Sequence, residues 1–140
     1  MRKALPIVLV VFLGGILGYF LVTGIAELRH GQTPLDARLA RVAANINEKL
    51  PMMADADTRL DKVTAGPGAQ LTYLFTLPNQ EKSAIDPTAF ENALRTNLIN
   101  NYKTNSQMEE MRAAKVSLKY QYKDKSGELF SQIVVTPKDF

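Results

Sequence analysis

Few side chains in this sequence have the types and spacing that chemistry requires. His30 is the sole histidine, and the chain of 140 residues contains no cysteine. A histidine or thiolate metal cluster therefore cannot form within one chain, and most nucleophilic machinery of the cysteine and serine hydrolases is missing. His30 also lies four residues beyond a long apolar run, which favours a solvated side chain close to a membrane over a catalytic one.

Three closely spaced acids, Asp55, Asp57 and Asp61, raise the question of a calcium site. An EF-hand loop needs an oxygen ligand at its fifth position, glycine at its sixth and glutamate at its twelfth. Counted from Asp55, those positions hold Arg59, Leu60 and Gly66. The motif fails, so we interpret these acids as turn formers and surface charges.

Methionines occur in two pairs, Met52-Met53 and Met108 with Met111. Thioethers can bind copper(I), but methionine more often fills irregular gaps in a core. Glu109-Glu110 lies where a helix is expected to begin, and the helix dipole is a sufficient reason for two acids there. We predict no catalytic, cofactor-binding or metal-ligating residue, no cofactor, and a protein that is not an enzyme.

The formal charge of +3 and the pI near 9.2 suggest a nucleic-acid partner at first sight. Lys119 and Lys123, however, alternate with Tyr120 and Tyr122, and on a strand alternate side chains point to opposite faces. That pattern is typical of a solvated face over a core face. Two of the basic residues, Arg2 and Lys3, lie ahead of all fourteen acids. The charge therefore indicates membrane topology, and we predict no nucleic-acid partner.

An uncharged run of 23 residues, 4–26, follows the basic segment 1–3. As a helix it would be about 34 Å long, enough to cross a bilayer core of about 30 Å. The sequence thus predicts a transmembrane signal anchor at 4–26 with a short cytoplasmic segment, 1–3, and a juxtamembrane linker, 27–33. The positive-inside rule places the N-terminus in the cytoplasm, the anchor in the inner membrane and the remaining chain, 34–140, in the periplasm.

Two features of this run bear on its helix partners and on whether it is cleaved. Gly14, Gly15 and Gly18 form a Gly-x-x-x-Gly pattern, through which another transmembrane subunit could pack closely, although glycine is also simply common in membrane helices. Gly24-Ile25-Ala26 has the small-x-small form of a signal peptidase site. Cleavage after Ala26 is the alternative to a retained anchor, and the length of the run favours retention.

Beyond this run the periodicity is that of a folded domain. Apolar residues at three- and four-residue steps predict helices at 34–50 and from Asp86-Pro87 to Tyr102, and a capping-box pattern at Ser106 predicts a short helix at 106–114. Alternation predicts strands at 58–65, 70–77, 116–123 and 128–135. We therefore expect an α+β fold in which an antiparallel sheet of two hairpins packs against two or three helices after the N-terminal transmembrane helix.

Several segments occur in the order found in a set of small bacterial envelope proteins of no assigned function, which residues 40–140 resemble. They are Leu50-Pro51-Met52-Met53-x-Asp55, Thr58-Arg59-Leu60-Asp61, Ala65-Gly66-Pro67-Gly68, Leu71-Thr72-Tyr73-Leu74-Phe75-Thr76-Leu77, Asn101-Tyr102, Val116-Ser117-Leu118-Lys119-Tyr120-Gln121-Tyr122 and Val135-Thr136-Pro137-Lys138-Asp139. The resemblance implies an envelope location and supplies no activity. It also implies two cysteines at the places that Lys103 and Phe140 occupy, so the disulfide expected of those proteins is absent here.

We thus expect a single-pass, non-enzymatic accessory subunit of a larger bacterial membrane assembly, with the bilayer and other transmembrane subunits as partners. The alternative is an exported module that binds a small ligand or an envelope polymer after its leader is cleaved. Such a module would need an aromatic-lined site near Tyr73, Phe75 or Tyr120, whereas a solid core there would count against it.

Overall fold

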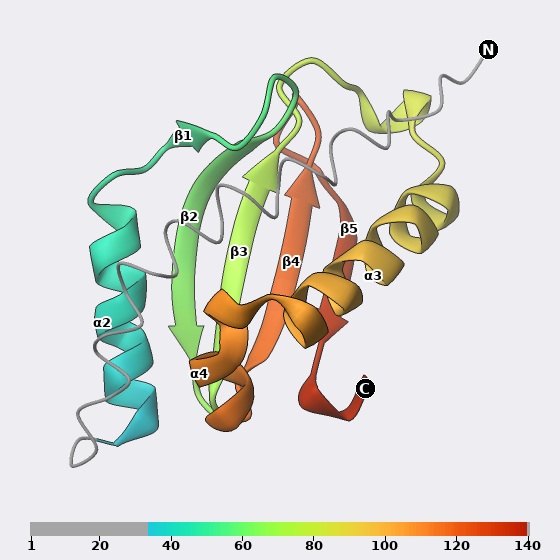
Figure 1. The fold of residues 1–140 in the computed structure, drawn as a ribbon. Coiled ribbons are helices and arrows are strands. Elements are labelled where there is room, and N and C mark those ends of the chain that lie inside the picture. Colours follow the sequence, from blue (N-terminus) through green and yellow to red (C-terminus); the bar gives the residue numbers. More distant parts are fainter. Residues whose placement is uncertain (1–33, 140) are drawn as a thin grey trace.

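The strands are the segments in which apolar and polar side chains alternate. The structure, a computed structural model, describes residues 34–139, with Gln107 described for its backbone only. The strands run in the order β1-β2-β3-β4-β5 across one sheet (Figure 1). Their bounds are β1 Met52–Met53, β2 Arg59–Gly66, β3 Gln70–Thr76, β4 Ser117–Lys123 and β5 Leu129–Val135. The four longer strands match the sequence prediction, whereas β1 is too short for any pattern to predict it.

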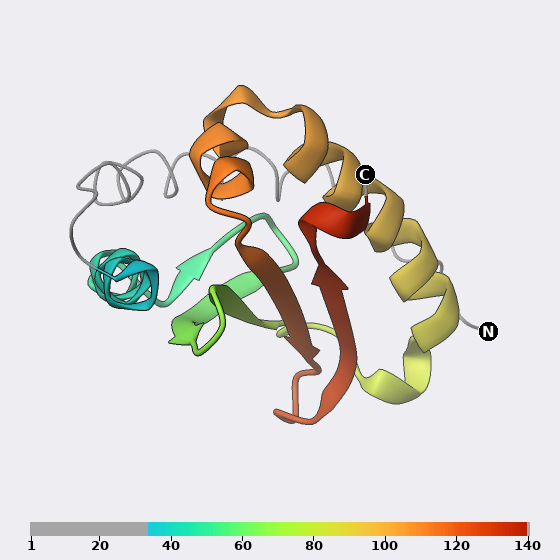
Figure 2. The same ribbon diagram turned by 90° about the horizontal axis from the view of Figure 1, so that it is seen from below.

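All three helices of the described residues lie on one side of the sheet (Figures 1 and 2). They are α2 (Leu35–Asn47), α3 (Pro87–Thr104) and α4 (Glu109–Ala113). Three short 3-10 helices accompany them: η2 (Lys82–Ala84) precedes α3, η3 (Ser106–Met108) precedes α4, and η4 (Pro137–Asp139) follows β5. Asp86 caps α3, because its carboxylate accepts hydrogen bonds from the backbone N–H groups of Thr88 and Ala89. The chain thus forms a two-layer α+β domain.

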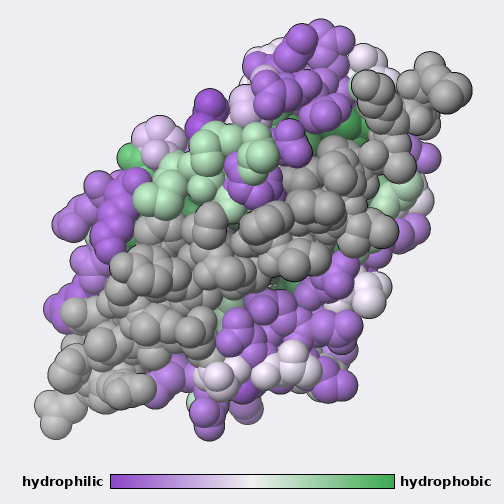
Figure 3. Space-filling model, turned by 45° about the horizontal axis from the view of Figure 1, so that its top comes forward, coloured by the Kyte–Doolittle hydropathy of each residue, from purple (hydrophilic) through white to green (hydrophobic). Residues whose placement is uncertain are grey.

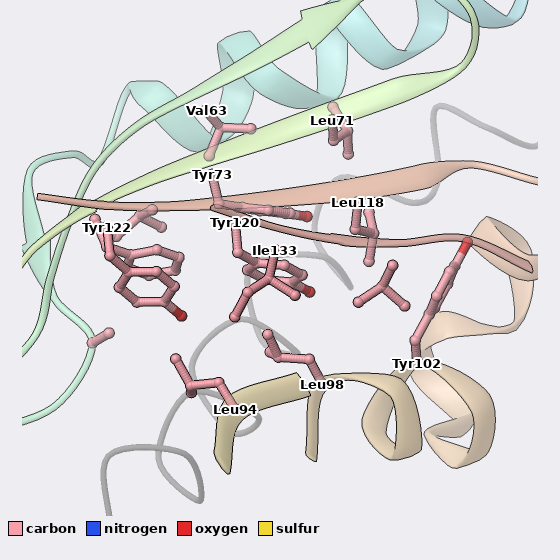
Figure 4. Close-up of a cluster of buried hydrophobic side chains, with 14 of the residues drawn as sticks. Val63, Leu71, Tyr73, Leu94, Leu98, Tyr102, Leu118, Tyr120, Tyr122 and Ile133 are labelled. Carbon is pink, nitrogen blue, oxygen red and sulfur yellow. The ribbon is translucent and has the colours of Figure 1, made fainter. Parts of the chain in front are cut away.

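The core lies between these two layers. α2 packs chiefly on β2 and buries Leu39, Val42 and Ile46, whereas α3 packs chiefly on β5 and buries residues at steps of four, among them Leu94 and Leu98. Figure 4 shows how the side chains of α3 meet those of β4 and β5. Both helices therefore use the apolar stripes that their sequences predict.

The predicted antiparallel sheet is wrong in one respect. β2 with β3 and β4 with β5 form the two expected hairpins, but β3 and β4 are parallel, with Gln70 opposite Ser117 and Thr76 opposite Lys123. The reason is the long connection from β3 through α3 and α4, which returns the chain to the end of the sheet where β3 began. The sheet is therefore mixed.

The predicted fold class also began with a transmembrane helix, and the structure does not support that fold. None of the helices in residues 34–139 is both long and apolar enough to span a bilayer. The run at 4–26 lies outside the described residues. What the structure does establish is the small α+β domain.

The short helix near residue 106 begins later than its capping-box pattern indicates. Residues 106–108 form the 3-10 helix η3, and α4 starts at Glu109 without a side-chain cap. Met108 and Met111 are both fully buried, so this segment is positioned by apolar burial rather than by a cap.

Candidate functional site

Two faces of the sheet differ completely in character. Tyr120 and Tyr122 of β4 point into the core, whereas Lys119, Gln121 and Lys123 of the same strand point away from the helices. This confirms the prediction that the lysines and the tyrosines lie on opposite sides. We call the sheet surface turned away from α2, α3 and α4 the open face, since no helix of residues 34–139 packs on it (Figure 2).

Tyr73, Phe75 and Tyr120, near which a ligand-binding module would need its site, form part of the core. The rings of Tyr73 and Tyr120 stack with centroids 5.3 Å apart, and those of Phe75 and Tyr122 stack at 5.0 Å (Figure 4). Phe90 of α3 meets Tyr122 edge-to-face at 5.0 Å. These rings are buried and packed against one another, which counts against a ligand module built on them.

Burial also keeps the phenols of this stack neutral. It raises the pKa of Tyr73 and that of Tyr122 well above the ordinary value near 10, and it raises the pKa of Tyr120 as well. The hydroxyl groups of Tyr73 and Tyr122 are buried and have no hydrogen-bond partner among the residues that the structure describes. A neutral phenol in such a place is neither a base nor a nucleophile at physiological pH.

The three acids that suggested a metal do not converge. Asp61 accepts hydrogen bonds from Arg59 Nε and from the hydroxyl group of Thr76. Asp55 instead accepts one from the backbone N–H of Asp57 at 2.7 Å, within its own turn, and burial raises the pKa of Asp55. Within the described ranges no three His, Asp or Glu side chains are arranged to hold a metal ion.

One transverse row of the open face crosses all five strands. The register places Met53 beside Arg59, Arg59 beside Thr76, Thr76 beside Lys123 and Lys123 beside Leu129. Partners in register share a face, so the five side chains form one line at the end of the sheet, which we call the end row. Met53 is 43% exposed and Leu129 is 48% exposed, and they lie on the two outer strands.

The turn between β4 and β5 positions Lys123 and Leu129, the two residues of the end row that lie on these strands. The carboxylate of Asp124 accepts hydrogen bonds from the backbone N–H groups of Ser126, Glu128 and Lys82 at 2.9, 3.0 and 3.0 Å and from the Ser126 hydroxyl group. These bonds, first among them the one from the Ser126 hydroxyl group, hold the pKa of Asp124 well below its usual range. Asp124 thereby ties the β4–β5 turn to η2 and fixes Leu129 opposite Lys123.

The charges within the strands all lie in or beside the open face and are mostly positive. The five strands contain four cations and one acid, namely Arg59, Lys62, Lys119, Lys123 and Asp61. Asp61 is paired with Arg59, which leaves the three lysines separate from any acid of the strands. The rows that contain the lysines hold polar residues, such as Gln121, which bonds to Gln132 at 2.9 Å, and also the apolar residues Leu74 and Val134.

The edge of the sheet beside α2 is closed by a side chain. β1 covers β2 only at Leu60 and Arg59. Further along β2, the amide group of Asn47 donates to the carbonyl oxygen of Val63 at 2.7 Å and accepts from the Val63 N–H at 2.8 Å. Asn47 therefore takes the place of a missing strand neighbour at this position.

Other residues singled out in the sequence do not join this surface. Gly14, Gly15, Gly18, Ala26 and His30 lie outside the described residues. Lys103, at one of the two expected cysteine places, is exposed on α3, and Phe140, at the other, also lies outside the described residues. The apolar ends of the end row were not predicted, because their position depends on register across four strand pairs.

The sequence matches the family model of a domain of unknown function, DUF8479, over residues 34–130. That span contains every strand and helix of the fold up to the start of β5. The chain belongs to the DUF8479 family. Among curated proteins, no sequence matches this DUF8479 chain.

Solved structures share the fold of this DUF8479 domain. The EpsS pilotin of the Vibrio vulnificus type 2 secretion system is similar with a TM-score of 0.60 and 12% identity, over 74% of this chain and 89% of that one. The type II secretion system pilotin AspS of Vibrio cholerae gives 0.57 and 16%, over 76% and 92%. A protein of Pseudomonas aeruginosa described as secreted gives 0.59 and 17%, over 75% and 95%.

Proposed function

We propose that this DUF8479 chain is a non-catalytic accessory protein of the bacterial cell envelope that binds a component of a secretion assembly. The observation that carries the proposal is the fold: two proteins with this fold are pilotins of type II secretion systems. The match takes in 89% and 92% of those chains, so it concerns their whole domain and not one shared motif.

The chemistry of the domain supports a binding role. Its tyrosines are buried in the core, where their phenol groups are neutral. Its acids, such as Asp55 and Asp86, accept hydrogen bonds in a turn and at a helix cap and do not converge on one site. What the described surface offers to a protein partner is an outer strand, β5, that has a strand neighbour on one side only. Sheet edges of this kind recognise proteins.

The test is purification of the tagged full-length chain from its native membranes in mild detergent, followed by mass spectrometry. We expect subunits of a secretion assembly to accompany it in fixed proportion, and loss of the gene to lower both the assembled complex and export of its cargo. If the chain purifies without such subunits and export is unchanged in its absence, the proposal is wrong. A catalytic turnover found with the purified chain would equally overturn the non-catalytic part.

A further inference from the structure

We propose that the open face of the sheet docks the domain on an anionic membrane surface, with Lys62, Lys119 and Lys123 contacting phosphate groups of lipid headgroups. This contact is separate from the protein partner proposed above, and either one can hold without the other. It rests on the charge of the described sheet, the spread of its lysines and its apolar margins.

The sheet has the largest excess of positive charge in the domain. Residues 34–139 contain fourteen Lys and Arg and thirteen Asp and Glu. Four of those cations and one acid belong to the strands, a net charge of +3, whereas α2, α3 and α4 together contain five cations and four acids, and the connecting segments contain five cations and eight acids. The sheet is thus the more positive of the two layers, and its open face is the side that an anionic surface attracts more strongly.

The spacing of the lysines suits a planar array better than one small anion. Lys119 and Lys123 are four residues apart on β4, which corresponds to about 13 Å along a strand. Lys62 lies on β2, in register with Leu74 of β3 and Gln121 of β4. The distance from β2 to β4 is two strand spacings, which corresponds to about 10 Å across the sheet. A single phosphate needs donors that converge, and an extended acidic peptide would follow one row, whereas these cations are spread over an area.

The end row adds an apolar contribution at both margins. Met53 and Leu129, on the outermost strands, flank Arg59 and Lys123 and are among the most exposed large apolar side chains of the described residues. Apolar side chains beside basic ones are typical of surfaces that rest in the headgroup layer, where the apolar part is buried and the cation stays among phosphates. In Figure 3 the visible part of the described surface is largely hydrophilic, with hydrophobic areas among the hydrophilic ones.

The experiment is amine labelling of the full-length chain on vesicles, read residue by residue by mass spectrometry. The vesicles are phosphatidylcholine alone or phosphatidylcholine mixed with phosphatidylglycerol. We expect Lys62, Lys119 and Lys123 to be labelled several-fold more slowly on the mixed vesicles, and the effect to vanish at high salt. Lys103 and Lys138, exposed elsewhere on the domain, are internal controls and should react equally on both.

Variants test the same contact by affinity. The change Lys62→Gln with Lys119→Gln and Lys123→Gln should lower the preference for anionic over zwitterionic vesicles roughly 100-fold, from about fivefold per lysine. The matched control, Arg95→Gln with Lys103→Gln and Lys138→Gln, removes the same charge from exposed positions outside the sheet and should keep most of the preference.

Three results would overturn the proposal. One is equal protection of the open-face lysines on both kinds of vesicle. Another is protection by inorganic phosphate alone, which would show an anion site instead of a docking surface. The third is protection by polyglutamate as strong as that by the mixed vesicles, which would assign the face to an acidic protein.

Discussion

Replacement of Asn47 by alanine tests how the edge of the sheet is closed. In the native fold the Asn47 amide satisfies both the N–H and the carbonyl oxygen of Val63, a residue whose side chain is fully buried. The substitution deletes two hydrogen bonds at once and leaves a backbone donor and acceptor without partners beside the core. α2 packs on β2, so the space that the Asn47 side chain would vacate is partly shielded from water.

The expected cost follows from these two bonds. Each hydrogen bond contributes about 1 kcal/mol net, and an unsatisfied buried group costs about 1–3 kcal/mol. Alanine returns up to about 0.5 kcal/mol through its higher helix propensity, since Asn47 is the last residue of α2. We therefore expect Asn47→Ala to lower the free energy of unfolding by about 1.5–3 kcal/mol.

The assay is urea-induced unfolding followed by circular dichroism, with Asn45→Ala as the matched control. Asn45 is in the same helix but exposed, so its replacement should be neutral or slightly stabilising. Asn47→Asp gives a second readout: its carboxylate would face the Val63 carbonyl oxygen, so the variant should regain stability at acid pH, where the protonated group can donate. Equal effects of Asn47→Ala and Asn45→Ala would refute the reasoning.

Three further predictions use the same measurement. Tyr73→Phe removes a buried hydroxyl group without a described partner and should leave the stability unchanged or raise it. Tyr102→Phe removes the donor to the Val116 carbonyl oxygen and should lower the free energy of unfolding by about 1–2 kcal/mol. The reverse order of the two effects would contradict this account of both hydroxyl groups. Asp124→Asn should reduce the loss of stability on acidification. A carboxyl group whose pKa is lowered in the folded state stabilises the fold above its unfolded pKa near 4 and loses that contribution as the pH falls. The same dependence of stability on acid pH in the variant and the native chain would argue against this role of Asp124. Leu98→Ala, which opens the contact between α3 and the sheet, should cost about 2–5 kcal/mol, and a cost below 1 kcal/mol would mean that α3 packs loosely.

Local chemistry predicted most elements of the fold. The alternation of Leu71, Tyr73 and Phe75 with polar residues is enough to predict β3, and Asp86-Pro87 is enough to predict where α3 begins, because a strand face and a helix cap each depend on a few neighbouring residues. The capping-box pattern at Ser106 was misleading, since burial of Met108 and Met111 decides the geometry there.

The arrangement of these elements, and with it the candidate site, could not be predicted in the same way. Nothing in the periodicity of β3 or β4 says that they are parallel, and β1 is two residues long. The end row requires Met53, Thr76 and Leu129 to share one line, which follows only from the register of four strand pairs with a bulge beside Lys123. Lys119 and Lys123 were predicted from the sequence to lie on a solvated face, but their position relative to Lys62 depends on the register of β2, β3 and β4.

The parallel pairing of β3 with β4 also bears on the order in which the domain folds. Hairpin partners are close in the chain, as Gly66 and Gln70 are, whereas each pair between β3 and β4 is 47 positions apart, from Gln70 with Ser117 to Thr76 with Lys123. The two hairpins can therefore form early and separately, and joining them requires closing a long loop that contains α3 and α4. Until that seam closes, β3 and β4 each expose an unpaired edge, so a newly made chain is most open to wrong strand pairing at what becomes the centre of its sheet.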